Sequence, residues 1–282
     1  MTAAYYILTV LFSAVQSVFA KKNGKENGDI KLFQLARAAV ALASFGIIII
    51  LSGKLHLDSA LYGSFYGVSL SLSMVSGYMA LKNGPMGLTS SVVSFSLIIP
   101  IIFSAITLGE RLTTFGICGL ILCFISIIFL NIGKKNDRGR ISNVWWLYTF
   151  ITLLTNGVCS ILQKLHGKAY GTEGKPDFMF FSSLVCTAIF LIIFIFGSKK
   201  EMHNIKATLK NGILTGIGNG AAGLFTLFLA TNVNSGVLFP IISVSTILAS
   251  LACGGIFFAE KLSKNQFIGF LVSITAIIFL QM

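Results

Sequence analysis

Long apolar segments separated by short polar breaks run through the whole chain. A helix rises about 1.5 Å per residue, so about 20 apolar residues cross a hydrocarbon layer about 30 Å thick. Charged residues or Gly, Pro and Asn mark the breaks and leave ten segments of about this length. These segments are residues 3–20, 33–51, 60–81, 86–108, 112–132, 144–165, 178–196, 213–230, 237–258 and 265–282. The pattern predicts an all-α membrane protein with ten transmembrane helices.

The chain also repeats itself. A shift of 150 positions places Glu110 on Glu260, and each of these residues stands between two long apolar runs. A second match, at a shift of 143 positions, places Lys21 on Lys164. Both ends of one unit therefore recur in a second unit, and we predict that the membrane domain is duplicated.

The predicted repeats divide the chain into two halves. Residues 1–134 form the first five-helix repeat, residues 135–143 form a basic connecting loop, and residues 144–282 form the second five-helix repeat. Because five is an odd number, the second repeat enters the membrane inverted relative to the first. Many secondary transporters are built from inverted repeats of this kind.

Composition and charge support the membrane assignment. Hydrophobic residues make up 55% of the chain and charged residues 11%, against about a quarter charged in soluble domains. The net charge is +12, but the basic residues concentrate in alternate connections, notably residues 21–37, 134–140 and 199–210. The positive-inside rule places these connections in the cytoplasm. We expect a lipid bilayer rather than a nucleic acid as the partner, in the bacterial cytoplasmic (inner) membrane.

No cofactor or metal site is indicated. The five cysteines lie inside predicted helices without CxxC spacing, so neither a zinc site nor a disulfide framework is predicted. The chain has no Walker sequence of the GxxxxGK[ST] form, which leaves ATP-driven transport without support.

At this point the residues show a family resemblance. The sequence YMALKNGP at residues 78–85, followed by Pro100 and by GERL at residues 109–112, resembles the EamA unit of the drug/metabolite transporter superfamily. The sequences LAT at residues 229–231 and AEKL at residues 259–262 resemble a weaker copy of the same unit. The resemblance implies a ten-helix transporter of small metabolites or drugs, often an exporter.

Polar side chains inside the apolar segments are candidate substrate contacts, because a polar group in hydrocarbon is costly and tends to face a bundle interior or a wet cavity. They form stripes on four predicted helices. The candidates are Ser13, Gln16, Ser17, Ser73, Ser76, Tyr78, Asn156, Ser160, Gln163, Asn219 and Thr226. Ser and Thr can instead bond to their own backbone one turn back, whereas an amide has more donors and acceptors than its own helix can satisfy.

Two pairs of charged residues stand at helix ends. We predict that Glu110 and Glu260 are structural, since a carboxylate near the N-terminus of the following helix satisfies free backbone amides and the helix dipole. We expect Lys21 and Lys164 to extend their ammonium groups to the membrane surface. The alternative is that these lysines guide an anionic group toward the substrate site.

The sequence therefore predicts a secondary transporter, an exporter or an exchanger, that moves a small polar metabolite such as an amino acid, or a drug, by alternating access. No carboxylate or imidazole lies in mid-membrane, which favours passive or exchange-driven transport over proton coupling. The alternatives are a channel or pore for small solutes and, less favoured, a membrane-embedded enzyme. For an enzyme the nearest grouping is His166, Glu173 and Asp177, which is interpreted more simply as a solvated loop. A monomer is compatible with the sequence.

Overall fold

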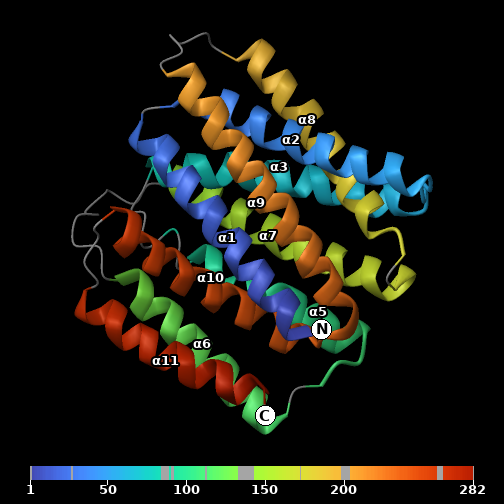
Figure 1. The fold of residues 1–282 in the computed structure, drawn as a ribbon. Coiled ribbons are helices and arrows are strands. Elements are labelled where there is room, and N and C mark those ends of the chain that lie inside the picture. The colour runs from blue at the N-terminus through green and yellow to red at the C-terminus, as the bar shows by residue number, and fades with distance from the viewer. Residues whose placement is uncertain are drawn as a thin grey trace. The chain divides into compact units, whose positions relative to one another are not determined.

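The computed structural model describes residues 2–26, 28–83, 89, 92–111, 113–132, 143–171, 173–197, 204–258 and 263–281. The elements, shown in Figure 1, are α1 (Thr2–Lys25), α2 (Ile30–Ser52), α3 (Ser59–Asn83), the 3-10 helix η1 (Phe95–Leu97), α5 (Ile98–Thr107), α6 (Thr114–Ile132), α7 (Asn143–Tyr170), α8 (Lys175–Phe196), α9 (Ile205–Asn232), α10 (Ser235–Phe258) and α11 (Lys264–Gln281). Six of these helices are long and apolar enough to cross a membrane, and three apolar helices are shorter. The prediction of an all-α membrane fold is confirmed.

Several helices extend beyond the predicted apolar segments. The helix predicted from residue 213 begins at Ile205, and the helix predicted from residue 178 begins at Lys175. In α9 the added turns carry Lys206 and Lys210, which are exposed. Such side chains can continue a helix past the hydrocarbon, because their charged ends remain in water. In the fourth predicted segment, the described helix covers residues 92–107 and contains the tight η1 turn.

The ends of α2 show how local sequence sets a boundary. The Asp29 side chain accepts hydrogen bonds from the backbone N–H groups of Lys31 and Leu32, at 2.8 and 2.9 Å. Such a cap satisfies donors that have no partner within the helix. At the other end Gly53 adopts φ 64°, and its N–H donates to the carbonyl of Ile49. Glycine enters this left-handed conformation without the steric cost of a side chain.

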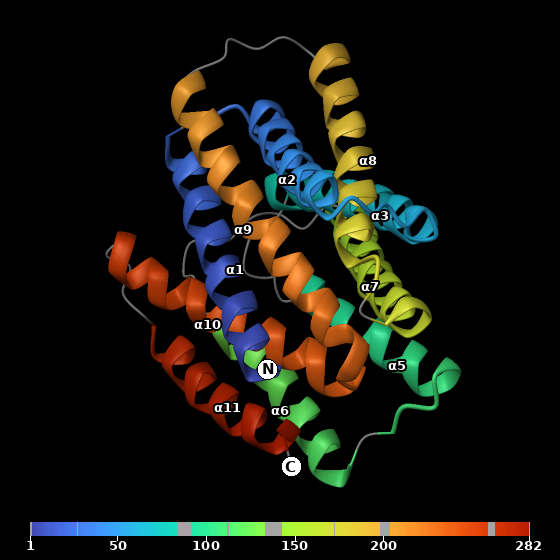
Figure 2. The ribbon, with the colours of Figure 1, turned by 45° about the vertical axis from the view of Figure 1, so that its right-hand side comes forward.

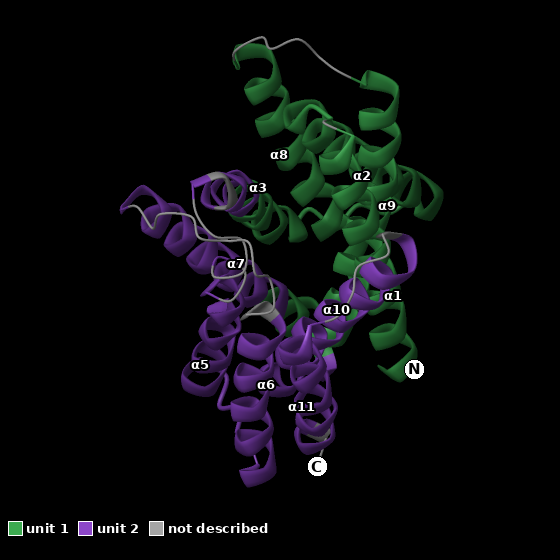
Figure 3. Ribbon diagram, turned by 90° about the vertical axis from the view of Figure 1, so that its left-hand side faces the viewer, with its two compact units in different colours: residues 1–71, 165–231 green, residues 72–164, 232–282 purple. Residues whose placement is uncertain are grey.

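The described helices form two compact units, drawn in different colours in Figure 3. Unit 1 contains Met1–Ser71 and Leu165–Thr231, and unit 2 contains Leu72–Lys164 and Asn232–Met282. Each unit therefore takes helices from both predicted repeats. The sequence repeats are interleaved in the packing, because the helices of one half bury their apolar faces against those of the other half.

In unit 2, α6 and α11 lie side by side (Figures 1 and 2), and their contacts reveal the relation between the repeats. A Cβ atom added to Gly119 would lie 2.9 Å from the backbone N of Leu280, and one added to Gly269 would lie 2.9 Å from the backbone N of Leu130. The shift of 150 positions converts one contact into the other. Because the higher-numbered residue of α6 meets the lower-numbered residue of α11, the two helices are antiparallel. Reciprocal contacts of this kind are those of a two-fold axis, as expected for two inverted copies of one helix.

In unit 1, glycines allow two further helix pairs to approach closely. Cβ atoms added to Gly63 and Gly67 of α3 would lie 2.5 Å from backbone oxygens of α8. A Cβ atom added to Gly216 of α9 would lie 2.5 Å from the backbone oxygen of Arg37 in α2. Small residues four positions apart are typical of tight packing between membrane helices. The α3–α8 pair and the α9–α2 pair correspond in the two repeats, and both pack closely through glycines.

Candidate functional site

A group of polar side chains joins α3 and α7 within unit 2. The Ser73 hydroxyl donates to Asn156 Oδ1 at 2.6 Å. One turn away, the Thr152 hydroxyl donates to the Ser76 hydroxyl oxygen at 2.8 Å. Ser73, Ser76 and Thr152 are buried, whereas Asn156 is half-buried. Three of these residues are predicted substrate contacts, and the structure brings them together.

Asn156 is the member of this group with unused hydrogen-bonding capacity. Its side-chain oxygen accepts from Ser73, but within the described part of the chain its side-chain nitrogen makes no hydrogen bond. An amide nitrogen carries two donor hydrogens. The residue is half-buried, so the protein does not enclose the amide fully.

Thr152 is a residue of this group that the sequence reasoning missed. It lies four positions before Asn156, on the same face of α7, and that spacing was the available signal. The other predicted members on α7 are Ser160, which donates to the backbone oxygen of Asn156 at 3.3 Å, and Gln163, which is buried. The Tyr78 side chain on α3 is 41% exposed and lies outside the buried group.

The predicted contacts on α1 and α9 belong to unit 1. The Ser17 hydroxyl donates to the backbone oxygen of Ser13 at 2.9 Å, and the Thr226 hydroxyl donates to the backbone oxygen of Ala222 at 2.8 Å. These hydroxyls therefore bond to their own helices, which is the alternative left open for Ser and Thr. Asn219 is half-buried.

Aromatic rings and one glycine join α1 to α9 in unit 1. The Tyr5 ring stacks on the rings of Phe225 and Phe228, at centroid distances of 5.9 and 5.4 Å. A Cβ atom added to Gly218 would lie 3.0 Å from the backbone N of Gln16. Gln16 therefore lies in a close contact between the two helices.

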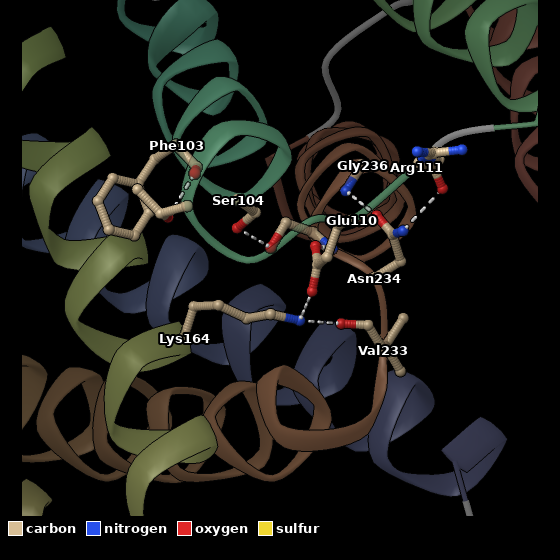
Figure 4. A network of polar contacts seen from close by, with 10 residues as sticks. Phe103, Ser104, Glu110, Arg111, Lys164, Val233, Asn234 and Gly236 are labelled. Atoms are coloured by element: carbon tan, nitrogen blue, oxygen red, sulfur yellow. Dashed lines mark hydrogen bonds and ion pairs between the residues drawn. The ribbon is translucent and has the colours of Figure 1, made fainter.

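A buried ion pair joins the two repeats inside unit 2 (Figure 4). Lys164 Nζ lies 2.5 Å from Glu110 Oε1 and donates to the backbone oxygen of Val233 at 2.6 Å. The other carboxylate oxygen of Glu110 accepts from the backbone N–H of Ser235 at 2.8 Å. Only 3% of the Lys164 side chain is exposed. The Lys164 ammonium group is thus buried and paired, so the expectation that it extends into water is wrong.

The position of Glu110 also differs from the prediction. The expected place, at the start of α6, is taken by Thr113, whose hydroxyl accepts from the backbone N–H of Gly116 at 3.0 Å. Glu110 instead contacts the first residue of α10, where Asn234 caps the next N–H group, that of Gly236, at 2.9 Å. The carboxylate therefore accepts a hydrogen bond from a free backbone amide at the start of a helix in the other repeat. Glu260 lies outside the described residues.

The surroundings of Glu110 favour its charged form. Burial on its own raises the pKa of this carboxyl group, but hydrogen bonds from Lys164 and Ser235, together with the charge of Lys164, outweigh burial. The pKa of Glu110 consequently lies below its ordinary value of 4.5. The Glu110 carboxyl group is therefore ionised at neutral pH.

A second polar group, in unit 1, was not expected. His166 Nε2 lies 2.9 Å from the Ser59 hydroxyl, and His56 Nδ1 lies 3.1 Å from Asp177 Oδ2. The side chains of His166 and Asp177 are buried, so their interpretation as part of a solvated loop is wrong. The missed signal was Pro176, which favours the first turn of a helix and places Asp177 within α8.

Within the residues that the structure describes, no group of three or more His, Cys, Asp or Glu side chains is placed to hold a metal ion. The polar groups described above consist of hydroxyls, amides, imidazoles and the charged side chains of Glu110, Lys164 and Asp177. Such groups bind solutes through hydrogen bonds and charge.

The geometry defines a class: a helical membrane protein with inverted repeats and polar groups inside its apolar units. Comparison with known proteins identifies the family. The model of the EamA-like transporter family matches residues 1–132 and 143–282, one copy in each half. This chain belongs to the EamA-like transporter family, whose members are drug/metabolite transporters. It is an integral, multi-pass membrane protein.

Two individual proteins that this chain resembles share less than a quarter of their residues with it. An uncharacterized protein of Haemophilus influenzae is 24% identical over 192 residues, which cover 64% of this chain and 62% of that protein. The chain thus spans somewhat less than two thirds of this curated relative. A crystal structure of another protein matches 99% of this chain and 98% of its own chain, with a TM-score of 0.73 and 15% identical residues. That likeness shows the shared fold.

Proposed function

We propose that this protein is a secondary transporter of a small polar metabolite, such as an amino acid, or of a drug. It works by alternating access between its two inverted repeats, as an exporter or an exchanger. The family assignment and the antiparallel contact between α6 and α11 support this proposal, since inverted repeats are the architecture of many such transporters.

The half-buried amide of Asn156 is the observation on which the proposal chiefly rests. An amide inside apolar helices is costly unless it is hydrogen-bonded. Ser73 satisfies its oxygen, and the proposed substrate accepts from its nitrogen. The remaining candidate contacts are proposed to line the path of the substrate; they are Ser13, Gln16, Ser17, Ser76, Tyr78, Ser160, Gln163, Asn219 and Thr226.

Glu110 and Lys164 have a different proposed role. Their ion pair holds the start of α10 beside α7, which keeps elements of the two repeats together in one conformation. We place Glu260 in the corresponding structural role of the second repeat, because the shift of 150 positions relates it to Glu110. Neither residue is proposed to contact the substrate.

Transport is proposed to be passive or driven by exchange. Asp177 lies in the first turn of α8. Glu110 lies outside the helices, in the connection between α5 and α6. Carboxylates that relay protons in pumps lie within the membrane helices and face the transport path. Uphill accumulation that follows an imposed pH step and disappears with an uncoupler would contradict this part of the proposal.

The test is transport by the purified protein in proteoliposomes loaded with a metabolite extract, with efflux identified by mass spectrometry. Replacing Asn156 with Ala removes a hydrogen bond worth about 0.5–1.5 kcal/mol net, so we expect transport to fall several-fold at equal protein amount. Asn83→Ala is the matched control, because Asn83 is exposed and bonds to its own helix. If Asn156→Ala and Asn83→Ala transported equally well, the proposal that Asn156 contacts the substrate would be wrong. Unitary currents in planar bilayers would instead indicate a channel.

A further inference from the structure

Lys175, the first residue of α8, is the most unusual charged group in unit 1. Its side chain is fully buried, with 0% of the residue exposed. Among the described residues its Nζ atom has no hydrogen-bond acceptor and no ion-pair partner. The contact that Nζ does make is with the ring of Phe228 in α9, whose centre lies 4.1 Å away.

A buried ammonium in this setting requires compensation. An aromatic face attracts a cation, but it does not replace the hydrogen bonds that an ammonium group donates to water. Charged side chains inside membrane proteins are therefore normally paired, or they mark a pathway for substrate or ions. Lys175 lacks such a pair in the described structure, which leaves a ligand as the missing partner.

The neighbours of Lys175 provide a second donor. His166 is also fully buried, and its Nδ1 atom has no partner. Gly174, the residue before Lys175, lies against the Ser59 hydroxyl that bonds His166. The His166 ring also lies 4.8 Å, between ring centres, from Phe178 near the start of α8, so His166 and Lys175 lie in the same region. When the Ser59 hydroxyl donates to His166 Nε2, the ring hydrogen resides on Nδ1, which then becomes a donor.

Asp177 is the carboxylate in this region, but it does not neutralise Lys175. Its Oδ2 atom lies 3.1 Å from His56 Nδ1. Lys175 and Asp177 are two positions apart on one helix, a spacing that points side chains in different directions. The positive charge at the start of α8 thus remains open to an anion.

We propose that Lys175 Nζ and His166 Nδ1 bind the carboxylate group of a small organic acid or amino acid. This inference rests on the proposed function, because the ligand is the transported substrate. Two donors match the two oxygens of a carboxylate, whereas phosphate sites typically gather more donors and favour Arg. The N-terminus of α8 adds a favourable dipole. The stacked rings of Phe228 and Tyr5 offer contact to the apolar part of the ligand.

The test measures thermal unfolding of the purified protein in lipid nanodiscs, at constant ionic strength, with rising concentrations of acetate, benzoate or L-leucine. The matched amides, acetamide, benzamide and L-leucinamide, lack the carboxylate, and inorganic phosphate tests for a general anion site. We expect saturable stabilisation by at least one of the carboxylates and none by the amides. Stabilisation by phosphate alone, or by no carboxylate, would overturn the proposal.

Variants locate the site. Lys175→Gln should weaken binding of the stabilising carboxylate by about 10- to 100-fold, the effect of losing a hydrogen bond from a charged group. Lys175→Arg should largely retain binding. Lys168→Gln removes the same charge from an exposed position in α7 and should change nothing. Should Lys175→Gln fail to fold, His166→Asn tests the second donor and should weaken binding several-fold. Unchanged binding in the variant that folds would refute the assignment.

The transport assay separates this inference from the proposed function. Release of neutral or cationic metabolites only, with no carboxylate moved or bound, would leave a transporter and overturn the carboxylate site. Binding of carboxylates that depends on Lys175, without transport of any solute, would support the site and overturn the transport proposal.

Discussion

The Glu110–Lys164 pair allows a quantitative prediction. Only 3% of the Lys164 side chain and 15% of the Glu110 side chain are exposed, so water does little to replace a lost partner. Removing one member of a buried ion pair costs about 3–5 kcal/mol, because the other charge stays buried and unpaired. Glu110→Gln keeps an oxygen that can accept a hydrogen bond from Ser235. We therefore expect it to destabilise the protein by about 3 kcal/mol, the lower end of this range. Lys164→Met should cost at least as much.

The double variant Glu110→Gln/Lys164→Met removes both charges. It should be clearly more stable than the sum of the single changes predicts, since no charge is left unpaired. Unfolding of the purified protein, followed by tryptophan fluorescence during heating, measures the effect. A change of 1 kcal/mol shifts Tm by about 2–4 °C in chains of 150–250 residues. Glu110→Gln should therefore lower Tm by about 6–12 °C, and Lys164→Met by at least as much.

Glu173→Gln is the control for the loss of one carboxylate, because Glu173 is exposed. Its Tm should stay close to that of the unaltered protein, as is usual for surface changes. If Glu110→Gln behaved like this control, or if the effects of the two single variants simply added, the pair would not hold α7 and α10 together. Glu110→Gln at normal abundance with weakened substrate affinity would move the binding site to this junction.

Three further predictions follow from the same structure. The pKa of Glu110 is lower in the folded protein than its ordinary 4.5. The stability that its charge contributes is therefore complete above about pH 5 and is lost as the pH falls through the folded pKa. Unfolding curves at pH 3 and pH 7 should consequently differ less for Glu110→Gln than for the unaltered protein. Gly119→Ala places a Cβ atom 2.9 Å from Leu280 N and should destabilise the protein by about 1–3 kcal/mol, whereas Gly24→Ala, with no atom within 4 Å, should not; equal stabilities would contradict the close packing of α6 on α11. A single cysteine at Asn204 should resist an impermeant thiol reagent added outside intact cells, as the positive-inside rule predicts, and ready labelling would reverse the orientation.

The class of fold follows from the sequence alone. The thickness of the bilayer sets the length of an apolar helix, so the lengths of the apolar segments indicate the helices before any packing is known. The same holds for the duplication, because the 150-position shift that relates Gly119 to Gly269 is visible in the sequence. The close approach of another helix at Gly63 and Gly67 was also predictable, because small residues four positions apart usually allow membrane helices to pack tightly.

Part of the candidate site was predictable for a similar reason. Asn156 is an amide in an apolar helix and needs partners beyond its own backbone, so its involvement in contacts between helices could be expected. That Ser73 is its partner, 83 positions away, could not be deduced. Helical periodicity tells which residues share a face, but it does not tell which face of another helix packs against it.

Only the tertiary structure decided the partners of the charged residues. Glu110 could cap the helix that follows it in sequence, yet Thr113 occupies that position and Glu110 meets Lys164 and Ser235 of the other repeat. Likewise, a solvated loop could follow residue 165, but His166 lies within α7 and packing buries it beside Ser59, 107 positions away. The sequence specifies how costly each polar group is in hydrocarbon, whereas the packing of helices distant in the chain determines which other group offsets that cost.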